Sequence, residues 1–412
     1  MELKKKVPEV RFRGFSGEWE ERSFREISES FEYGLNAAAT KYDGENKYIR
    51  ITDINDESHS FDENDLTSPK ADLKLAENYM LKTGDVLFAR TGASVGKTYI
   101  YRKVDGRVYY AGFLIRARLK AEVNADFIFQ STLTERFSQF VRLTSQRSGQ
   151  PGINAQEYSN YSILVPENTE QSRIGTWFQH LDQLITLHQK KYNKLTNIKK
   201  AMLEIMFPKN GADVPEIRFE GFEGKWEEKK LGEISENTYG GGTPATYETS
   251  FWNGDIAWFQ SSDLAENKLS EITPRKFISK EGLKSSAAKL IPGNSIAIVT
   301  RVGVGKLVLV PYSYTTSQDF LSLSKLKIET WFCLYSIWKK LQSELFSVQG
   351  TSIKGITKEE ILLKQICVPM EFKEQQKIGT YFQKLDHLIT LQQIQLEKLK
   401  NIKKACLEKM FV

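Results

Sequence analysis

The sequence is poor in the residues that build disulfide frameworks and metal centres. It has three cysteines and four histidines in 412 residues. The cysteine count is odd and shows no pair spacing, which argues against a disulfide framework and favours a reducing compartment such as the cytoplasm. No histidine has a cysteine or a second histidine at metal-ligand spacing, so no metal site of that kind is expected.

Long apolar runs are also missing. No stretch approaches the roughly 18 apolar residues that a membrane span needs. The charged start, residues 1–8, is not followed by the apolar run of a signal peptide. Hydrophobic residues make up 40% of the chain and aromatic residues 12%, a globular composition. A chain of this length suits two domains of moderate size, and no membrane partner is expected.

Signatures of catalysis are absent as well. There is no G-x-S-x-G, no Asp-Pro-Pro or Asn-Pro-Pro stretch, and no dinucleotide fingerprint. The segment TGASVGKT (91–98) invites comparison with a phosphate loop, but that motif needs glycine where Thr91 stands. We therefore expect no enzymatic activity. A nuclease site of scattered carboxylates and lysines remains an alternative, because its sequence signature is weak.

An internal repeat organises the chain. Residues 7–29 match residues 214–236 at 15 of 23 positions, and residues 173–207 match 377–411 at 23 of 35. The interiors between these matched ends agree only in scattered places, which indicates tandem duplication of a whole unit. The predicted parts are a first arm and variable domain (1–168), a long helix (169–208), a second arm and variable domain (209–372) and a second long helix (373–412).

The two repeated C-terminal segments are predicted to be long helices that pair. Apolar positions in the first alternate in steps of three and four, the spacing of a coiled-coil seam, with polar His188 and Lys191 in the middle. The second has Gln392 and Gln395 there. Direct repeats that associate face to face imply a pseudo-two-fold, antiparallel pair, each helix about 50 Å long. The predicted interface residues are Leu181, Leu184, Leu195, Ile198, Leu385, Leu388, Leu399 and Ile402. An amphipathic helix packed on its own domain is the alternative.

The variable interiors are predicted to be mixed. Residues 108–119 and 295–299 alternate like strands, whereas 127–143 and 331–346 have helical patterns. The expected fold class is therefore α+β: two mixed domains joined by the antiparallel coiled coil. The order of the strands cannot be read from the pattern.

Positive charge is concentrated in the helical segments. The net charge is +6, and residues 170–207 and 373–412 carry +3 and +4 of it, which leaves −1 for the rest. A diffuse basic coat is thus excluded, and nucleic-acid contacts elsewhere must come from local clusters.

Glycine-broken loops in each variable domain carry side chains suited to DNA. The loops are 84–97 and 148–153 in the first half, and 293–306 and 351–356 in the second. Glycine lets the backbone approach a sugar-phosphate chain, while Arg, Lys, Ser and Gln neutralise phosphates or read base edges. The candidate DNA-binding residues are Arg90, Ser94, Lys97, Arg147, Gln150, Arg301, Lys306, Ser352 and Lys354. Ordinary surface loops with solvated charges are the alternative.

Tyrosines lie among cations near these loops and could stack on bases. They are Tyr99, Tyr101, Tyr109 and Tyr110 in the first half, and Tyr312 and Tyr314 in the second. Tyrosines in strands more often pack against neighbours, and packing is the favoured interpretation here.

The combination resembles the specificity subunits of type I restriction-modification enzymes over nearly the full length. The resemblance rests on PEIRFEGFEGKWEE (215–228), GDVLFARTGASVGK (84–97) and the repeated helix opening QxxIGTxFQxLDxLITL. It implies that each variable domain, a target-recognition domain, reads one half of a split site in double-stranded DNA. The unlike loops that contain Arg147 and Ser352 predict two unlike half-sites, and hence an asymmetric target.

The resemblance also implies partners for the chain. The helix pair would set the spacing between the half-sites and dock two methyltransferase subunits, and restriction subunits would add cleavage. S-adenosylmethionine, ATP and Mg would belong to those partners, with no cofactor in this chain. The rival to this interpretation is a scaffold that joins proteins and has no affinity for DNA.

Overall fold

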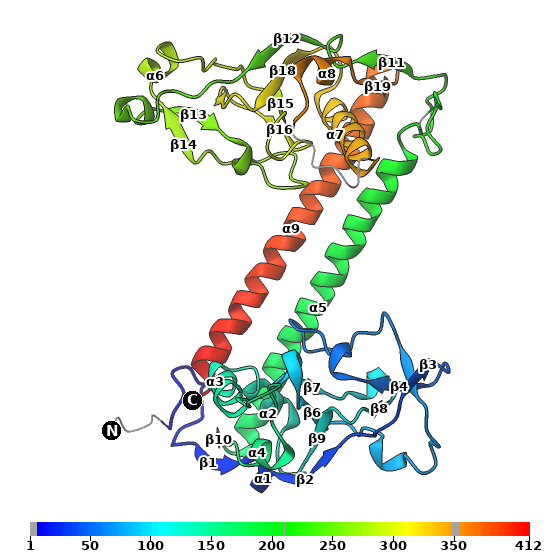
Figure 1. Ribbon diagram of the computed structural model, residues 1–412, viewed down its shortest axis with the longest axis vertical. Helices are drawn as coiled ribbons and strands as arrows, with labels where there is room; N and C mark the ends of the chain where they lie inside the picture. The colour runs from blue at the N-terminus through cyan, green and yellow to red at the C-terminus, as the bar shows by residue number, and fades with distance from the viewer. Residues whose placement is uncertain (1–5, 210, 348–354) are drawn as a thin grey trace. The chain divides into compact units, whose positions relative to one another are not determined.

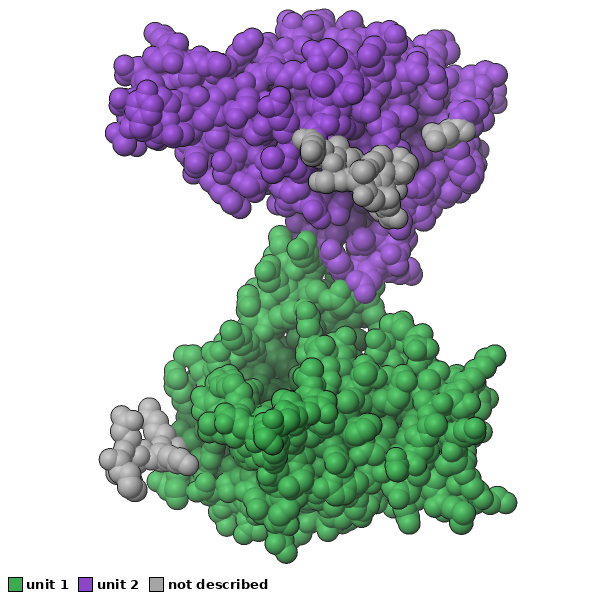
Figure 2. All heavy atoms as spheres, viewed as in Figure 1, with its two compact units in different colours: residues 1–190, 392–412 green, residues 191–391 purple. Residues whose placement is uncertain are grey.

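The computed structural model describes residues 6–209, 211–347 and 355–412, and these form two compact units. Unit 1 comprises residues 1–190 and 392–412, and unit 2 comprises residues 191–391 (Figure 2). Each unit therefore contains one variable domain together with one part of each long helix. The domain limits predicted from the sequence follow the repeat instead, with each helix as a part of its own.

Unit 1 is built on a four-stranded antiparallel sheet of order β2-β9-β6-β7 (Figure 1). Two antiparallel pairs, β1·β10 and β3·β5, and the parallel pair β4·β8 lie outside this sheet. The strands are β1 (Glu20–Ser23), β2 (Ser28–Tyr33), β3 (Ala39–Lys41), β4 (Asn46–Ile49), β5 (Thr67–Pro69), β6 (Val86–Ala89), β7 (Thr98–Ile100), β8 (Arg107–Tyr110), β9 (Leu114–Leu119) and β10 (Ser162–Val165). The short helices are α1 (Phe24–Ile27), α2 (Ala125–Ser131), α3 (Glu135–Thr144) and α4 (Ala155–Ser159).

Unit 2 repeats the main sheet, the arm pair and the parallel pair of unit 1, but here β14 joins the parallel pair in a three-stranded sheet. Its four-stranded antiparallel sheet has the order β12-β18-β15-β16, the arm strand pairs as β11·β19, and β13 pairs in parallel with β17. The strands are β11 (Glu227–Lys230), β12 (Ser235–Gly240), β13 (Ile256–Phe259), β14 (Lys276–Ile278), β15 (Ser295–Val299), β16 (Leu307–Val310), β17 (Thr315–Thr316), β18 (Phe320–Leu326) and β19 (Gln365–Val368). The helices are α6 (Lys280–Lys284), α7 (Thr330–Ser347) and α8 (Lys358–Leu363). The duplication seen in the sequence is thus a duplication of fold.

The variable domains are mixed α and β, as their patterns predict. The stretch 127–143, predicted as one helix, is two helices, because Thr134 caps α3 by accepting from the backbone N–H of Phe137. The stretch 331–346 is the single helix α7.

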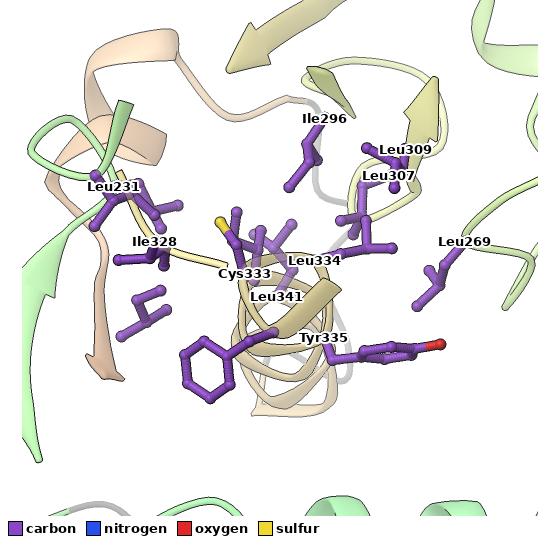
Figure 3. Close-up of a cluster of buried hydrophobic side chains, with 14 of the residues drawn as sticks. Leu231, Leu269, Ile296, Leu307, Leu309, Ile328, Cys333, Leu334, Tyr335 and Leu341 are labelled. Atoms are coloured by element: carbon purple, nitrogen blue, oxygen red, sulfur yellow. The ribbon is translucent and has the colours of Figure 1, made fainter. Parts of the chain in front are cut away.

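The main core of unit 2 joins its sheet to its helices. Figure 3 shows Ile296, Leu307 and Leu309 of the sheet facing Leu334 and Leu341 of α7. The same buried cluster includes residues of both long helices, among them Leu203 and Phe382. The long helices are therefore part of the domain core. Burying such large side chains stabilises a fold by about 1.5–3 kcal/mol each.

Each arm is held against the first turn of a long helix by a buried ion pair. In unit 1 the guanidinium of Arg11 donates to both carboxylate oxygens of Glu170, at 2.6 Å each, and to the carbonyl of Gly17. In unit 2 Arg218 does the same with Glu374, at 2.7 Å, and with Gly224. Both carboxylates are fully buried.

Each arm also joins the end of the other long helix in its unit. The N–H of Val10 donates to the carbonyl of Lys409 at 2.9 Å, and the N–H of Ile217 donates to that of Ile205 at 3.0 Å.

The long helices α5 (Asn168–Ile205) and α9 (Phe372–Met410) pair in an antiparallel way within each unit. In unit 1, early Asp182 meets late Lys403 at 2.7 Å, and in unit 2 early Asp386 meets late Lys199 at 2.5 Å. These are equivalent positions of the repeat. His188 of α5 contacts Gln392 of α9, its equivalent in the repeat, at 2.8 Å. In an antiparallel pair of copies, residues at the midpoint lie opposite their own equivalents, so this contact agrees with the antiparallel pairing.

The helix pair buries only part of the predicted seam. Leu181 and Leu385 are buried, whereas Leu195, Ile198 and Leu399 are half-buried against the unit cores. Leu184, Leu388 and Ile402 are 44%, 42% and 36% exposed. The apolar stripe of each long helix is therefore wider than the face that the other helix covers. A two-stranded pair buries only one narrow face of each helix.

Candidate nucleic-acid interface

The first glycine-broken loop of unit 1 connects β6 to β7. It turns through a short 3-10 helix at Gly92–Ser94, and Gly96 has a φ of +87°. The N–H of Gly96 donates to the hydroxyl of Tyr158 at 3.2 Å, and a Cβ at this position would lie 2.6 Å from Cγ1 of Val141. Glycine is thus required here for both backbone conformation and close packing.

The second predicted loop lies directly beside the first. Thr91 forms a β-bridge with Gly152, the N–H of Gly92 donates to the carbonyl of Pro151 at 2.9 Å, and the N–H of Ile153 donates to that of Arg90 at 2.9 Å. Two loops that are about 50 residues apart in the chain are therefore one surface. This brings the candidates Arg90, Ser94, Gln150 and their neighbours together.

Arg90 and Gln150 are the best-presented candidates of this surface. The Arg90 guanidinium lies over the ring of Tyr33, 4.8 Å from its centroid, and Tyr33 is itself 42% exposed. Among the described residues, no carboxylate pairs with Arg90. Gln150 is exposed, with its amide against Gly92, and Ser94 is half-buried. A stacked, unpaired guanidinium is oriented for a base edge or a phosphate.

The other two candidates of unit 1 already have partners. Lys97 pairs with the exposed Asp56 at 2.5 Å. Arg147 binds both carboxylate oxygens of Glu157, at 2.5 and 2.6 Å, and two backbone carbonyls. Arg147 would have to leave this bidentate pair to reach a base. Lys97 can exchange one exposed carboxylate for a phosphate with little rearrangement, because surface pairs are weak.

Unit 2 builds the equivalent surface with different side chains. The N–H of Ile356 donates to the carbonyl of Thr300 at 2.8 Å, as Ile153 does to Arg90. Arg301 is exposed beside Gly355, and the Lys306 ammonium donates to the carbonyl of Leu264 at 3.1 Å. Ser352 and Lys354 lie outside the described residues.

The tyrosines near the loops are mostly core residues. Tyr99, Tyr101, Tyr109, Tyr110 and Tyr314 are buried, and Tyr312 is partly exposed with its hydroxyl on the carbonyl of Ile272. Burial raises the pKa of Tyr99 well above its ordinary value, and its hydroxyl donates to Asp105. The interpretation as packing is confirmed for the five buried rings. The aromatic residue that lies at the surface is Tyr33, which the sequence reasoning missed and which ends strand β2 beside Gly34.

Within residues 6–209, 211–347 and 355–412, no group of three or more His, Cys, Asp or Glu side chains could hold a metal ion. No helix of the same described part has the length and apolarity that crossing a membrane requires.

Comparisons with known proteins agree with one another. The family model described as type I restriction modification DNA specificity domain matches residues 16–197 and 223–401. The MjaIX type I restriction enzyme specificity subunit of Methanocaldococcus jannaschii is 29% identical over 195 residues, which cover 45% of this chain and 44% of the relative. The EcoR124I/EcoR124II specificity subunit of Escherichia coli is 32% identical over 174 residues, 40% of this chain and 42% of the relative. Each match thus spans less than half of the relative's length.

A solved structure covers more of the chain. The S subunit of a type I restriction-modification system from M. genitalium superimposes with a TM-score of 0.61 over 98% of this chain and 99% of that chain. Its sequence identity is 13%, so this likeness concerns the fold.

Proposed function

Because the chain belongs to the family of type I restriction modification DNA specificity domains, we propose that it reads DNA sequence for a type I restriction-modification enzyme. Unit 1 reads one half of a split, asymmetric site in double-stranded DNA, and unit 2 reads the other half. The chain itself catalyses nothing. Methyltransferase subunits that use S-adenosylmethionine and restriction subunits that use ATP and Mg supply the chemistry.

The observation that carries this proposal is the contrast between framework and loops. Both units position a pair of glycine-broken loops by the same backbone hydrogen bonds, at Arg90 in unit 1 and at Thr300 in unit 2. One lysine is common to both surfaces, as Lys97 and Lys306, but the other side chains presented there differ: Arg90 and Gln150 on one surface, Arg301 on the other. Two unlike sets of polar side chains on one scaffold suit two unlike half-sites, because base edges are distinguished by donor and acceptor pattern.

The long helices support a role in spacing. They contain 38 and 39 residues, and at 1.5 Å per residue each extends about 57 Å. One turn of DNA separates half-sites by about 34–36 Å. A helix pair of this length is sufficient to fix such a separation.

Exposed leucines on the helices support docking of two identical partners. Leu184 and Leu187 of α5 are exposed in unit 1, and their equivalents Leu388 and Leu391 of α9 are exposed in unit 2. The same apolar surface is therefore presented twice. Recurrent exposed apolar patches mark protein interaction sites, and two methyltransferase subunits would fill both.

Methylome sequencing tests the reading function. A cell that makes this chain with a compatible methyltransferase subunit should gain adenine methylation at one split, asymmetric motif, and omission of either protein should abolish it. No new methylation despite a formed complex would contradict the proposal and favour the scaffold. DNA cleavage by the purified chain with a metal ion would favour the nuclease alternative.

Paired variants test the docking surface. Leu184→Arg with Leu388→Arg should weaken capture of the methyltransferase subunit, while DNA affinity is retained. The matched control is Leu143→Arg, which changes an exposed leucine of α3 that is 74% accessible. If the paired Leu184→Arg, Leu388→Arg variant captured the methyltransferase subunit as well as the Leu143→Arg control does, the docking surface would lie elsewhere.

A further inference from the structure

A second pair of equivalent positions lies outside the loops described above. β4 ends at Ile49, β13 ends at Phe259, and each strand runs parallel to its partner. The next residue is Arg50 in unit 1 and Gln260 in unit 2, and a 3-10 turn follows in both. The backbone equivalence is close, because the N–H of Ala111 donates to the carbonyl of Ile49 as that of Ser317 donates to Phe259.

In each unit, an aspartate three residues after this position caps the turn. The N–H of Arg50 donates to Oδ2 of Asp53 at 2.9 Å, and the N–H of Gln260 donates to Oδ2 of Asp263 at 2.9 Å. Both aspartate side chains are largely or fully buried. The aspartate is therefore part of the repeated framework, and its capping role does not depend on the side chain at 50 or 260.

The side chain at this position is oriented in unit 1. Nε of Arg50 donates to Oδ2 of Asp53 and Nη2 donates to Oδ1, both at 2.8 Å. This side-on pair uses neither Nη1 nor the second hydrogen of Nη2, among the described residues no acceptor binds them, and the side chain is 33% exposed. The edge of the guanidinium that carries them has the fork geometry that matches O6 and N7 of guanine.

Gln260 occupies the same place with different chemistry. Its side chain is half-buried, and within the described part of the chain its amide has no hydrogen-bond partner. A glutamine amide offers one donor and one acceptor group, which matches N7 and N6 of adenine. Asp263 has a cation of its own, because Nε of Arg275 lies 3.6 Å from its Oδ1, so the ion pair does not require a charged side chain at 260.

Both positions lie next to the candidate interface of their unit. In unit 1 the segment after Arg50 reaches the first loop, because Asp56 pairs with Lys97 and Nδ1 of His59 contacts the carbonyl of Thr98 at 3.0 Å. In unit 2 Lys306 donates to the carbonyl of Leu264, four residues after Gln260. A DNA segment on the loops would thus be within reach of these turns.

Resting on the proposed function, we infer that Arg50 and Gln260 are specificity-determining residues, each reading one base pair. Arg50 recognises a guanine in the half-site of unit 1. Gln260 recognises an adenine at the corresponding place in the half-site of unit 2.

Selection from randomised DNA duplexes, with the full chain in complex with its methyltransferase subunits, tests the inference. Arg50→Gln should change one base pair in one half-site from G·C towards A·T, with a fall in guanine preference of roughly 5- to 150-fold. Gln260→Arg should produce the opposite change in the other half-site only. Arg50→Lys keeps a cation for Asp53 but lacks the fork, so it should relax the same base pair without loss of folding.

Controls and outcomes separate this inference from the proposed function. Arg25→Gln and Gln383→Arg change exposed residues of the same two units and should leave the motif unchanged. If the wild-type complex enriches a motif that Arg50→Gln, Arg50→Lys and Gln260→Arg all retain, with melting temperatures like the wild type, the inference is overturned and the proposed function stands. If the wild-type complex enriches no motif at all, the proposed function fails, and the inference fails with it.

Discussion

Unit 1 and unit 2 hold their arms with the same contacts and present different side chains at their loops. Arg11 binds Glu170 and Arg218 binds Glu374 with nearly identical distances. Where Arg90 lies over Tyr33 in unit 1, the backbone equivalents in unit 2 are Thr300 and Gly240. The arm pairs are buried, and any change there leaves a charge without its partner. Arg90, Gln150 and Arg301 are partly or fully exposed, where substitution costs little stability, whereas Thr300 is buried.

The largest expected effect tests the shared part of this comparison. Arg11→Met leaves the buried carboxylate of Glu170 without its cation and should destabilise unit 1 by about 3–5 kcal/mol. Arg218→Met should do the same to unit 2. Hydrogen exchange with mass spectrometry locates the loss of protection, which should stay within the unit that carries the substitution. Arg13→Met, an exposed arginine of the same arm, is the control. A large effect in only one unit would show that the two arms are not equivalent.

Helix packing provides the second test. Leu181→Ala and Leu385→Ala remove equivalent buried side chains, and each should cost about 2–5 kcal/mol. Leu184→Ala and Leu388→Ala, one turn further along, should change the free energy of unfolding by less than about 0.5 kcal/mol. Urea unfolding measures both pairs. Comparable losses for all four would mean that the exposed leucines also stabilise the free chain.

A third test addresses the part that differs. Arg90→Ala should weaken binding to the half-site of unit 1 by about 1–3 kcal/mol, whereas Thr300→Ala at the equivalent place should have little effect. Lys97→Ala should instead weaken binding to all sequences about equally. It should also lower the magnitude of the slope of the logarithm of the binding constant against the logarithm of the salt concentration by about one, because one phosphate contact is lost. Titration of duplexes carrying single changes, at several salt concentrations, separates these outcomes. Equal losses for Arg90→Ala and Thr300→Ala would contradict the asymmetry.

The smallest expected effect concerns pH. Burial lowers the pKa of His59 below its ordinary 6.5, with Lys403 and Lys97 adding to the shift and Asp182 opposing it. The unfolded chain therefore binds this proton more readily than the folded one. The stability that the neutral His59 contributes to the folded state is present above about pH 6.5. It is lost as the pH falls towards the lowered pKa of His59 in the folded chain. Exchange protection of unit 1, corrected for intrinsic rates, should drop modestly by pH 5.5, and His59→Asn should remove the dependence. Asparagine suits this site because φ is +51° there.

Local patterns predicted much of this molecule. The repeat gave the duplicated fold, the three-four spacing predicted the long helices, and the glycines marked loops that lie together in space. Sheet order was not accessible, because β2 pairs with β9 through residues about 85 apart, and parallel pairs such as β4·β8 have no local signature. The partners of individual side chains could not be read from the sequence either. Nothing near Arg147 in the sequence showed that Glu157 would bind it, and Tyr33 meets Arg90 only through the fold.

The division of each long helix between the two units has a consequence for synthesis. The aromatic cluster of unit 1 includes Phe411, stacked on Phe127 and in edge contact with Trp19. These partners emerge from the ribosome far apart in time. At about 5–20 residues per second, the segment 392–412 follows residue 190 by roughly 10–40 s. The N-terminal domain therefore lacks these C-terminal contacts while most of unit 2 is translated, and its part of the aromatic cluster stays uncovered during that interval.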